Sequence, residues 1–594
     1  MLNQHSESKT GENTVADFMA DHLLHRLYRL QEKHRHIPFQ LMVEVARESG
    51  LPVSQVAAVV NFYSFFYQQP VGRYHLLFSN CTSCGYQAGE VNLLALLRQQ
   101  LSIVPGQTRT DGVVSVDETS CIGMCDHGPS MLVNGAPIVN LDEDRIRQLC
   151  GLIAAEQSLD RWPADWFRIN NHIRKPGLLL NAPLQSGGSL SKALAGDAQR
   201  MLESIVQSGL RGRGGAGFAT GKKWLFCREA EGDARYVVCN ADEGEPGTFK
   251  DRVLLQCHAD ALFEGMTLCA YGIGAKKGFL YLRGEYRYLL GHLQTVLRRR
   301  YDSGLLGASI LGQAGFSFDI ELVVGAGAYI CGEESALIES LEGKPGIPRI
   351  RPPFPVTHGY LGCPTVVNNV ETFIAAAHIV QDGSDGFGAV GTEKSPGSKL
   401  LSVSGDCRTP GIYEYPYGAS IQQVLDDCGA TQVQAVQIGG PAGSLLAKKD
   451  FNRRISFEDV STGGSFLIFG EYRDLLSINR NFARFFAHES CGFCTPCRVG
   501  TRLLENSIGK IADGRATWRD VDEIKQLSRI VSRYSHCGLG HTAANHILDS
   551  VRHFPGHIQN VLAQQAFTPA FDLDAALETA RQLTQRDDAD AHLE

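Results

Sequence analysis

Four cysteines near the end of the chain have the spacing of an iron–sulfur site. Cys491, Cys494 and Cys497 form a C-x2-C-x2-C run, and Cys537 follows a stretch of helical pattern. Three thiolates at this spacing can reach three corners of one compact cluster, and a distant cysteine completes the ligand set. Structural zinc is the alternative, but zinc sites usually pair two C-x2-C knuckles. The spacing therefore predicts a [4Fe-4S] cluster.

Two more cysteine pairs lie in the first third of the chain. Cys81 and Cys84 follow a predicted strand at residues 74–78, and Cys121 and Cys125 lie in a glycine-rich segment. Two pairs at two strand-to-loop transitions predict a [2Fe-2S] cluster in which each pair holds one iron. A redox dithiol is the alternative, because C-x2-C after a strand is also typical of thioredoxin-like chemistry. The second pair favours metal ligation.

A glycine-rich loop suggests a site for an anion. Gly212, Gly214 and Gly217 satisfy G-x-G-x-x-G, but the loop follows a predicted helix, whereas the dinucleotide fingerprint follows a strand. It is not a P-loop, because Lys223 stands where that motif has serine or threonine. Bare backbone beside Arg213 and two lysines suits a phosphate group. A purely structural glycine loop is the alternative.

Carboxylates gather after two other predicted strands. A strand at residues 236–239 leads into Asp242, Glu243 and Glu245, and an apolar strand breaks at Gly332 before Glu333 and Glu334. Carboxylates at the end of a buried strand are costly unless they bind a partner, and the hydroxyls of a ribose or ribityl chain would serve. For Glu333 and Glu334 taken singly, a solvated surface is an equal alternative.

The composition sets broad limits. The chain has 594 residues, 43% hydrophobic and 20% charged, with a net charge of −8, so we expect a soluble protein with about three to five domains. The charge excludes a typical nucleic-acid binder. No apolar run reaches the length of a membrane span and the N-terminus lacks a signal peptide, which predicts a cytoplasmic protein. Seventeen cysteines fit metal ligation in a reducing compartment.

The elements that must position these residues divide the chain into parts, and the predicted class is α/β multidomain. The expected parts are a helical lead and [2Fe-2S] domain at 14–157, a linker at 158–178, a nucleotide-binding α/β domain at 179–395, a β-domain at 396–475, a helical [4Fe-4S] domain at 476–560, and a C-terminal helix with an acidic tail at 561–594.

The N-terminal part resembles a known family. The run 61–66, the segment 70–75 and the two cysteine pairs are similar to the 24-kilodalton-type subunit of respiratory complex I, which implies a thioredoxin-like [2Fe-2S] domain. That family spaces its first pair C-x4-C, whereas this chain has Tyr86 at the expected position of the second ligand. The resemblance therefore leaves the role of Cys84 in question.

From about Lys175 to Phe554 the chain resembles the 51-kilodalton-type flavoprotein of complex I, which binds FMN and NADH in one cavity and carries a ubiquitin-like β-grasp domain. The resemblance implies roles for named residues. FMN would be bound by Gly212, Arg213, Gly214, Lys223, Asn240, Asp242, Glu243, Gly332, Glu333, Glu334, Asn368 and Asn369. Adenine would be held by Phe218, Phe226 and Phe354, and NADH approached by Glu245, Glu334 and Arg351, the last in place of the usual lysine.

The fusion of both modules in one chain resembles the diaphorase large subunit of NAD-reducing [NiFe] hydrogenases. This resemblance implies FMN, NAD, [4Fe-4S] and [2Fe-2S] as cofactors, no residue acting as nucleophile or base, and as partners a small iron–sulfur diaphorase subunit and the large and small hydrogenase subunits. A molybdenum formate dehydrogenase or a complex I-like enzyme is the alternative partner. A zinc-binding scaffold is the non-enzymatic alternative.

Overall fold

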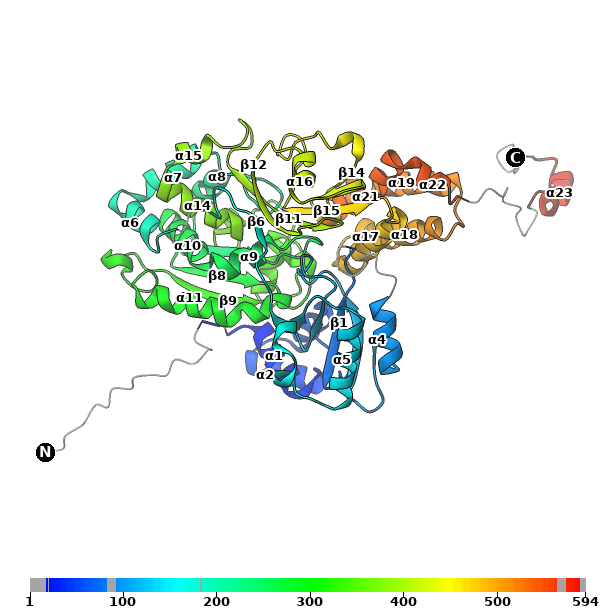
Figure 1. Cartoon of the computed structure of the whole chain (residues 1–594), viewed down its shortest axis with the longest axis horizontal. Helices are drawn as coiled ribbons and strands as arrows, with labels where there is room; N and C mark the ends of the chain where they lie inside the picture. Colours follow the sequence, from blue (N-terminus) through cyan, green and yellow to red (C-terminus); the bar gives the residue numbers. More distant parts are fainter. Residues whose placement is uncertain (1–17, 20, 83–91, 182–183, 563–572, 588–594) are drawn as a thin grey trace.

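The computed structural model describes residues 18–19, 21–82, 92–181, 184–562 and 573–587. Figure 1 shows an N-terminal domain in blue to cyan, a parallel-sheet domain mainly in green, a β-grasp domain in yellow-green to yellow and a helical domain in orange. This architecture confirms the predicted multidomain α/β fold. Cys84 and the acidic tail beyond Asp587 lie outside the described residues.

The parallel-sheet domain is built on four parallel strands in the order β10-β7-β8-β9. They are β7 (Tyr236–Ala241), β8 (Lys277–Leu282), β9 (Asp319–Val324) and β10 (Thr365–Asn369). Their apolar runs are largely buried, as expected for a parallel sheet with both faces covered. Because all four strands run in one direction, their carboxyl ends meet at one edge of the sheet, where open α/β sheets bind ligands.

Helices surround this sheet, and two of them, α10 and α14, are buried almost throughout and pack against each other. The helices are α6 (Gly188–Ala195), α7 (Ala198–Gln207), α8 (Thr220–Glu229), α9 (Lys250–Cys257), α10 (Ala259–Ile273), α11 (Leu290–Asp302), α12 (Glu334–Leu341), α13 (Pro355–His358), α14 (Val370–Asp382) and α15 (Ser384–Gly388). Two short 3-10 turns, η3 (Gly284–Leu289) and η5 (Tyr329–Gly332), follow β8 and β9.

The N-terminal helices share a hydrophobic core with the parallel-sheet domain, while the sheet that follows them has a core of its own. They are α1 (Leu23–His34), α2 (Phe39–Ser49) and α3 (Val53–Phe62). Tyr28 Oη donates to the Gly325 carbonyl at 2.8 Å, and Tyr63 Oη donates to Ser340 Oγ at 2.7 Å. The helical lead thus packs across the boundary that the sequence suggested.

The thioredoxin-like sheet has the order β2-β3-β1-β4-β5, with β1 and β3 parallel. Its elements are β1 (Tyr74–Ser79), α4 (Leu93–Leu101), β2 (Gln107–Thr108), β3 (Val114–Thr119), β4 (Met131–Val133), β5 (Ala136–Ile138) and α5 (Glu143–Ala154). The segment predicted as a linker contains a strand, β6 (Ile173–Lys175), which pairs with the edge of the β-grasp sheet.

The β-grasp domain confirms the expected insert. Its elements are β11 (Ser398–Gly405), β12 (Gly411–Pro416), α16 (Ile421–Asp427), β13 (Val433–Ile438), β14 (Ser444–Ala447) and β15 (Ser465–Gly470). The sheet order is β14-β13-β15-β11-β12-β6, and the first and last strands of the domain, β11 and β15, lie side by side and parallel.

The helical domain follows. Its elements are α17 (Leu475–Glu489), α18 (Thr495–Ala512), α19 (Trp518–Tyr534), α20 (Gly538–Thr542), α21 (Asn545–His553) and α22 (Pro555–Gln559), and α23 (Leu573–Thr584) lies farther along the chain. Helix α19 begins with a capping box between Thr517 and Asp520, which satisfies backbone N–H groups at its start. Across the described helices, none combines the length and apolar character needed to cross a bilayer.

Candidate flavin and iron–sulfur sites

The helical domain brings together the four cysteines predicted to hold a [4Fe-4S] cluster. Cys494 is the N-cap residue of α18, Cys497 lies in the first turn of that helix, and Cys537 is the N-cap residue of α20. With Cys491, they line one small cavity. The positive end of the α18 dipole would stabilise the negative charge of a bound cluster.

The sulfurs at this cavity lie farther apart than one zinc ion would hold them. A tetrahedral zinc with bonds of about 2.3 Å holds its thiolates within about 4 Å of one another. Among the described residues, no three of these four cysteine sulfurs all lie within 4.8 Å of one another. Burial raises the pKa of Cys497 to about 12 and that of Cys537 to about 11, so metal binding must displace their protons.

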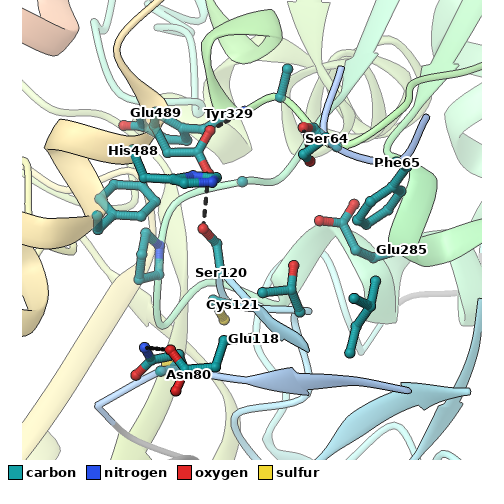
Figure 2. A pocket seen from close by; sticks show the side chains of 18 of the residues that line it. Ser64, Phe65, Asn80, Glu118, Ser120, Cys121, Glu285, Tyr329, His488 and Glu489 are labelled. Atoms are coloured by element: carbon teal, nitrogen blue, oxygen red, sulfur yellow. Dashed lines mark hydrogen bonds and ion pairs between the residues drawn. The ribbon is translucent and has the colours of Figure 1, made fainter. Parts of the chain in front are cut away.

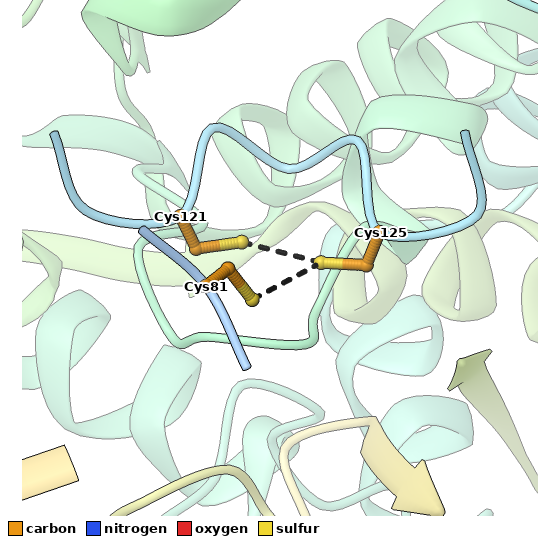
Figure 3. Close-up of side chains that lie close together, drawn as sticks. All are labelled: Cys81, Cys121 and Cys125. Carbon is orange, nitrogen blue, oxygen red and sulfur yellow. Dashed lines mark hydrogen bonds between the residues drawn. The ribbon is translucent and has the colours of Figure 1, made fainter. Parts of the chain in front are cut away.

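Sheet register explains how distant cysteines meet at the second cluster site. Strands β1 and β3 are paired so that Ser79 lies opposite Thr119, and each strand is followed two residues later by a cysteine, Cys81 or Cys121. Figure 3 shows the sulfurs of Cys81, Cys121 and Cys125 converging. The Cys121 and Cys125 sulfurs are 3.2 Å apart, and those of Cys81 and Cys125 are 4.0 Å apart.

All three sulfurs are buried and lie within 4.8 Å of one another. They supply a convergent set of thiol donors, which is the ligand type of a [2Fe-2S] cluster. The close Cys121 and Cys125 pair fits two ligands of one iron. The predicted fourth ligand, Cys84, lies outside the described residues, and its role stays a prediction.

The parallel sheet places the predicted flavin ligands at its carboxyl edge. Asn240 at the end of β7 lies opposite Asn369 at the end of β10. Asn240 Nδ2 donates to the Gly332 carbonyl at 2.8 Å, which joins this edge to the turn after β9. Trp224 Nε1 donates to Asn368 Oδ1 at 2.8 Å. Segments far apart in the sequence therefore form one edge of the sheet.

The acidic run after β7 splits into different roles. Both oxygens of Glu243 face the interior, where they accept from the backbone N–H groups of Asp251 and Arg252 at 2.8 and 3.1 Å and cap α9. Burial raises the pKa of Glu243 to about 7. Burial also raises the pKa of Asp242 well above its ordinary value.

A second group of charges lies beside the turn at Gly332. Lys223 Nζ contacts Glu334 Oε2 at 2.8 Å and donates to the Val367 carbonyl at 3.0 Å. Arg351 Nη1 lies 3.2 Å from Glu333 and 3.5 Å from Glu334. Two cations and two carboxylates thus gather at this turn, and all four side chains keep partial exposure to solvent.

The glycine loop closes on itself and packs tightly against the sheet edge. The Gly212 N–H donates to the Phe218 carbonyl at 2.9 Å. A Cβ at Gly214 would lie 3.2 Å from the Asn369 side chain, so a larger residue would require that side chain to shift. The Arg213 guanidinium is buried, lies 4.7 Å from the Tyr417 ring and donates to the Pro396 carbonyl. Its charge is therefore directed toward the β-grasp side of the loop.

The three phenylalanines that the resemblance assigns to adenine are unusually exposed. Phe218, Phe226 and Phe354 keep 50%, 48% and 52% of their surface accessible, and the first two ring centroids are 6.5 Å apart. Exposed aromatic faces of this kind can stack on a planar base.

Buried polar atoms with no hydrogen-bond partner support the fit of a large polar cofactor. In the described part of the chain they include Asp242 Oδ2, Thr248 Oγ1, Thr220 Oγ1 and two nitrogens of Arg213. These side chains come from the segments around the glycine loop and the acidic run. Buried polar groups are normally paired, so the pattern is expected of a site that a polar ligand completes.

Sequence reasoning missed a buried ionic cluster beneath the glycine loop. Glu371, wholly buried, accepts from Lys399 Nζ and lies 3.0 Å from Lys250 Nζ, and Lys399 also donates to the Arg213 carbonyl at 3.1 Å. Burial lowers the pKa of Lys399 to about 7, although Glu371 favours its charged form. A lysine within the apolar strand at 398–403 was the signal available in the sequence.

A cavity of about 240 Å³ lies where three domains meet, and it was also missed (Figure 2). Glu489, at the end of α17, accepts from Ser120 Oγ at 2.8 Å and from the Tyr329 N–H at 3.0 Å. It therefore joins the loop before Cys121 to the turn before Gly332. The sequence feature that could have identified Glu489 is its position two residues before Cys491.

Three family models match the chain. Residues 12–153 match the thioredoxin-like [2Fe-2S] ferredoxin, residues 205–378 the Nuo51 FMN-binding domain, and residues 477–561 the NADH-ubiquinone oxidoreductase-F iron-sulfur binding region. These matches confirm FMN and both clusters as the cofactors of the three regions.

Two relatives and one solved structure match larger parts of the chain than any single family model. The chain is 42% identical to the alpha subunit of the NAD-reducing hydrogenase HoxS of Cupriavidus necator, over 93% of this chain and 94% of that protein. It is 38% identical to one of the NADH-quinone oxidoreductase subunits of Rhizobium meliloti, over 64% of this chain and 96% of that protein. A crystal structure of an NAD+-reducing [NiFe]-hydrogenase in the H2-reduced state has a chain with 44% identity and a TM-score of 0.87, covering 97% of this chain and all of that one.

Full-length similarity, three matching domain models and convergent cysteine sites all indicate the same family. This chain belongs to the family of alpha subunits of NAD-reducing hydrogenases.

Proposed function

We propose that this chain is the NAD(H)-oxidising flavin and iron–sulfur subunit of a cytoplasmic NAD-reducing [NiFe] hydrogenase. The full-length similarity to a HoxS alpha subunit carries the proposal, because it includes the N-terminal [2Fe-2S] domain as well as the flavin domain. The quinone oxidoreductase relative from Rhizobium meliloti leaves about a third of this chain unmatched. The fused layout therefore favours the hydrogenase over a complex I-like enzyme.

Bound FMN exchanges electron pairs with a nicotinamide and single electrons with an iron–sulfur cluster. The chain's own residues would bind the flavin and NAD(H) and orient them. The sheet edge with Asn240 and Asn369 would hold the flavin, and the exposed rings of Phe218 and Phe226 would hold the adenine of NAD(H). Nothing in the reaction requires a side-chain nucleophile.

The helical domain offers a surface for the electron-accepting partner. Apolar side chains are exposed at Phe493, which lines the [4Fe-4S] cavity, and on helices α18 and α19. They are Phe493, Val499, Leu503, Ile530 and Tyr534, at 46–64% of their surface. The pairs on α18 and α19 are each four residues apart and so share a helix face. Exposed apolar patches commonly mark protein interfaces. This one supports docking of the small iron–sulfur diaphorase subunit, with the large and small [NiFe] subunits completing the complex.

Purification of the native complex tests the proposal. We expect the chain to co-purify with a nickel-containing partner, and we expect the complex to reduce NAD+ with hydrogen. A complex that contains molybdenum and reduces NAD+ with formate would show that a formate dehydrogenase is the true partner. A colourless protein with zinc and no flavin would instead indicate a scaffold.

Glu245 is expected to govern the choice between NADH and NADPH. Its carboxylate accepts from Tyr329 Oη and from the Ala442 N–H, and burial raises its pKa to about 7. The side chain is therefore mostly neutral below pH 7 and charged above it. A charged carboxylate near the ribose repels a 2′-phosphate. In the wild type, kcat/KM for NADPH relative to NADH should fall as the pH rises through about 7.

Glu245→Gln should flatten this pH dependence and raise relative activity with NADPH by about 10-fold, the equivalent of roughly 1.4 kcal/mol. Glu321→Gln, which changes a surface carboxylate paired with Lys277, is the control. An unchanged NADH to NADPH ratio in Glu245→Gln would rule out this role.

A further inference from the structure

The cysteine loop Cys121–Asp126 is held by the flavin domain at three points. The first is Cys121 itself, the second is Gly123, and the third is Asp126, which follows Cys125. Figure 3 shows the turn between Cys121 and Cys125. Each contact leads back to Glu243, the acidic-run residue at the carboxyl end of β7.

Arg283 makes the first contact, from the residue after β8. Its Nη2 donates to the Cys121 carbonyl at 2.8 Å, and its Nη1 donates to the Glu243 carbonyl. The side chain is 5% exposed and forms a two-point ion pair with Glu285, with Nε at 3.0 Å from Oε2. One guanidinium therefore joins the backbone of a cluster ligand to the backbone of the flavin segment.

Tyr286 makes the second contact. A Cβ at Gly123 would lie 2.1 Å from Tyr286 Oη, so glycine is required there, and its φ of +74° also favours glycine. The same hydroxyl donates to Glu243 Oε2 at 2.9 Å.

Arg252 makes the third contact. Its Nη2 lies 2.7 Å from Asp126 Oδ1, both side chains are fully buried, and its backbone N–H donates to Glu243 Oε2. Burial opposes a charge on Asp126, but Arg252 and two histidines hold the pKa of this carboxyl below its ordinary range. The loop is thus anchored on both sides of Gly123.

We propose that Arg283 is a positioning residue for the [2Fe-2S] cluster, which fixes Cys121 against the flavin segment and raises the reduction potential of the cluster. The inference rests on the proposed function. Of the three contacts, only that of Arg283 brings a charged group to a cysteine of the convergent group, through a hydrogen bond to the Cys121 carbonyl. Adding an electron to a cluster adds negative charge, and a buried cation in a medium of low dielectric stabilises that charge.

Removal of the Glu285 charge should shift the cluster potential in the direction opposite to removal of the Arg283 charge. Its carboxylate offsets part of the Arg283 charge, and it lines the same cavity as Cys121 (Figure 2). Removal of the cation should lower the cluster potential, whereas removal of the carboxylate should raise it. A purely structural role would not produce shifts of opposite sign.

The experiment is a mediated redox titration of the intact protein, with the electron paramagnetic resonance signal of the [2Fe-2S] cluster as the readout. In Arg283→Met we expect the ratio of reduced to oxidised cluster at a fixed potential to fall at least 10-fold, which is 59 mV for one electron. Glu285→Gln should raise this ratio. Arg283→Lys should fall between the wild type and Arg283→Met, because it keeps the charge but loses the fork of donors.

Arg287→Met is the matched control, because Arg287 lies in the same turn but pairs at the surface with Glu32. Unchanged potentials in both Arg283→Met and Glu285→Gln would overturn the proposal. If Arg283→Met does not assemble the cluster, Glu285→Gln decides: an upward shift supports the proposal and no shift overturns it. Reduction of bound FMN by NADH, measured in the wild type, tests the proposed function separately, because chemical mediators reduce the cluster without NADH.

Discussion

Replacing Cys537 with serine is expected to abolish the [4Fe-4S] cluster while FMN stays bound. Cys537 lies in the same cavity as Cys491, Cys494 and Cys497, and the flavin segments belong to another domain. Outer-shell changes at metal sites typically cost 10- to 100-fold, so loss of a ligand should lower electron delivery to an acceptor subunit by at least about 100-fold.

Iron, acid-labile sulfide and flavin fluorescence, measured on one preparation, check this result. The iron of the [4Fe-4S] cluster should be lost and that of the [2Fe-2S] cluster retained. Cys363→Ser is the control, because its thiol donates to the Leu361 carbonyl, as a hydroxyl also can, and Cys363 lines neither cysteine site. A full iron content in Cys537→Ser would show that Cys537 is not a ligand.

Glu371→Gln is expected to destabilise the fold by about 3–5 kcal/mol, because it leaves buried lysines without their shared carboxylate. Glu371 is 0% exposed, accepts from Lys399 and lies 3.0 Å from Lys250. It also accepts from the Leu400 N–H at 3.1 Å, so it ties β11 to α14. Chemical denaturation, followed by circular dichroism, measures the change.

The pH dependence of the stability difference between wild type and Glu371→Gln follows from the direction in which the Glu371 pKa is shifted. Burial opposes the charged form of Glu371, but Lys399 and Lys250 hold its pKa below the ordinary value. Its contribution is therefore complete above the ordinary carboxyl pKa and is lost as the pH falls through the folded value. The gap between wild type and Glu371→Gln should shrink in acid.

The surface pair Lys277 and Glu321 provides the matched comparison. Glu321→Gln should change stability by less than about 1 kcal/mol, because exposed ion pairs contribute little. Equal losses in both variants would contradict a special role for the buried cluster.

The site residues predicted from the family resemblance fall into two groups. Asn240, Asn369 and Gly332 meet at one sheet edge, as a shared cofactor site requires. Glu243 and Arg213 instead use their side chains within the protein, as a helix cap and as a contact with the β-grasp side. Their direct contact with FMN stays a prediction.

The sequence by itself determined the chemistry that depends on residue type and short spacing. The C-x2-C-x2-C run at Cys491–Cys497 predicts a cluster because local backbone geometry sets the positions of three ligands that lie within seven residues. The strand before Cys81, the β-grasp pattern and the final helix at 573–584 were also predicted, because hydrophobic periodicity and turn residues act locally.

Only the tertiary structure decided what depends on contacts between distant segments. The helical lead packs on the parallel sheet, and β6 in the linker joins the β-grasp sheet. Arg283, which joins Cys121 to Glu243, is also invisible to local pattern. A charged side chain in a sequence has the same appearance whether it is solvated or buried, and only the fold supplies the partners that make its burial tolerable.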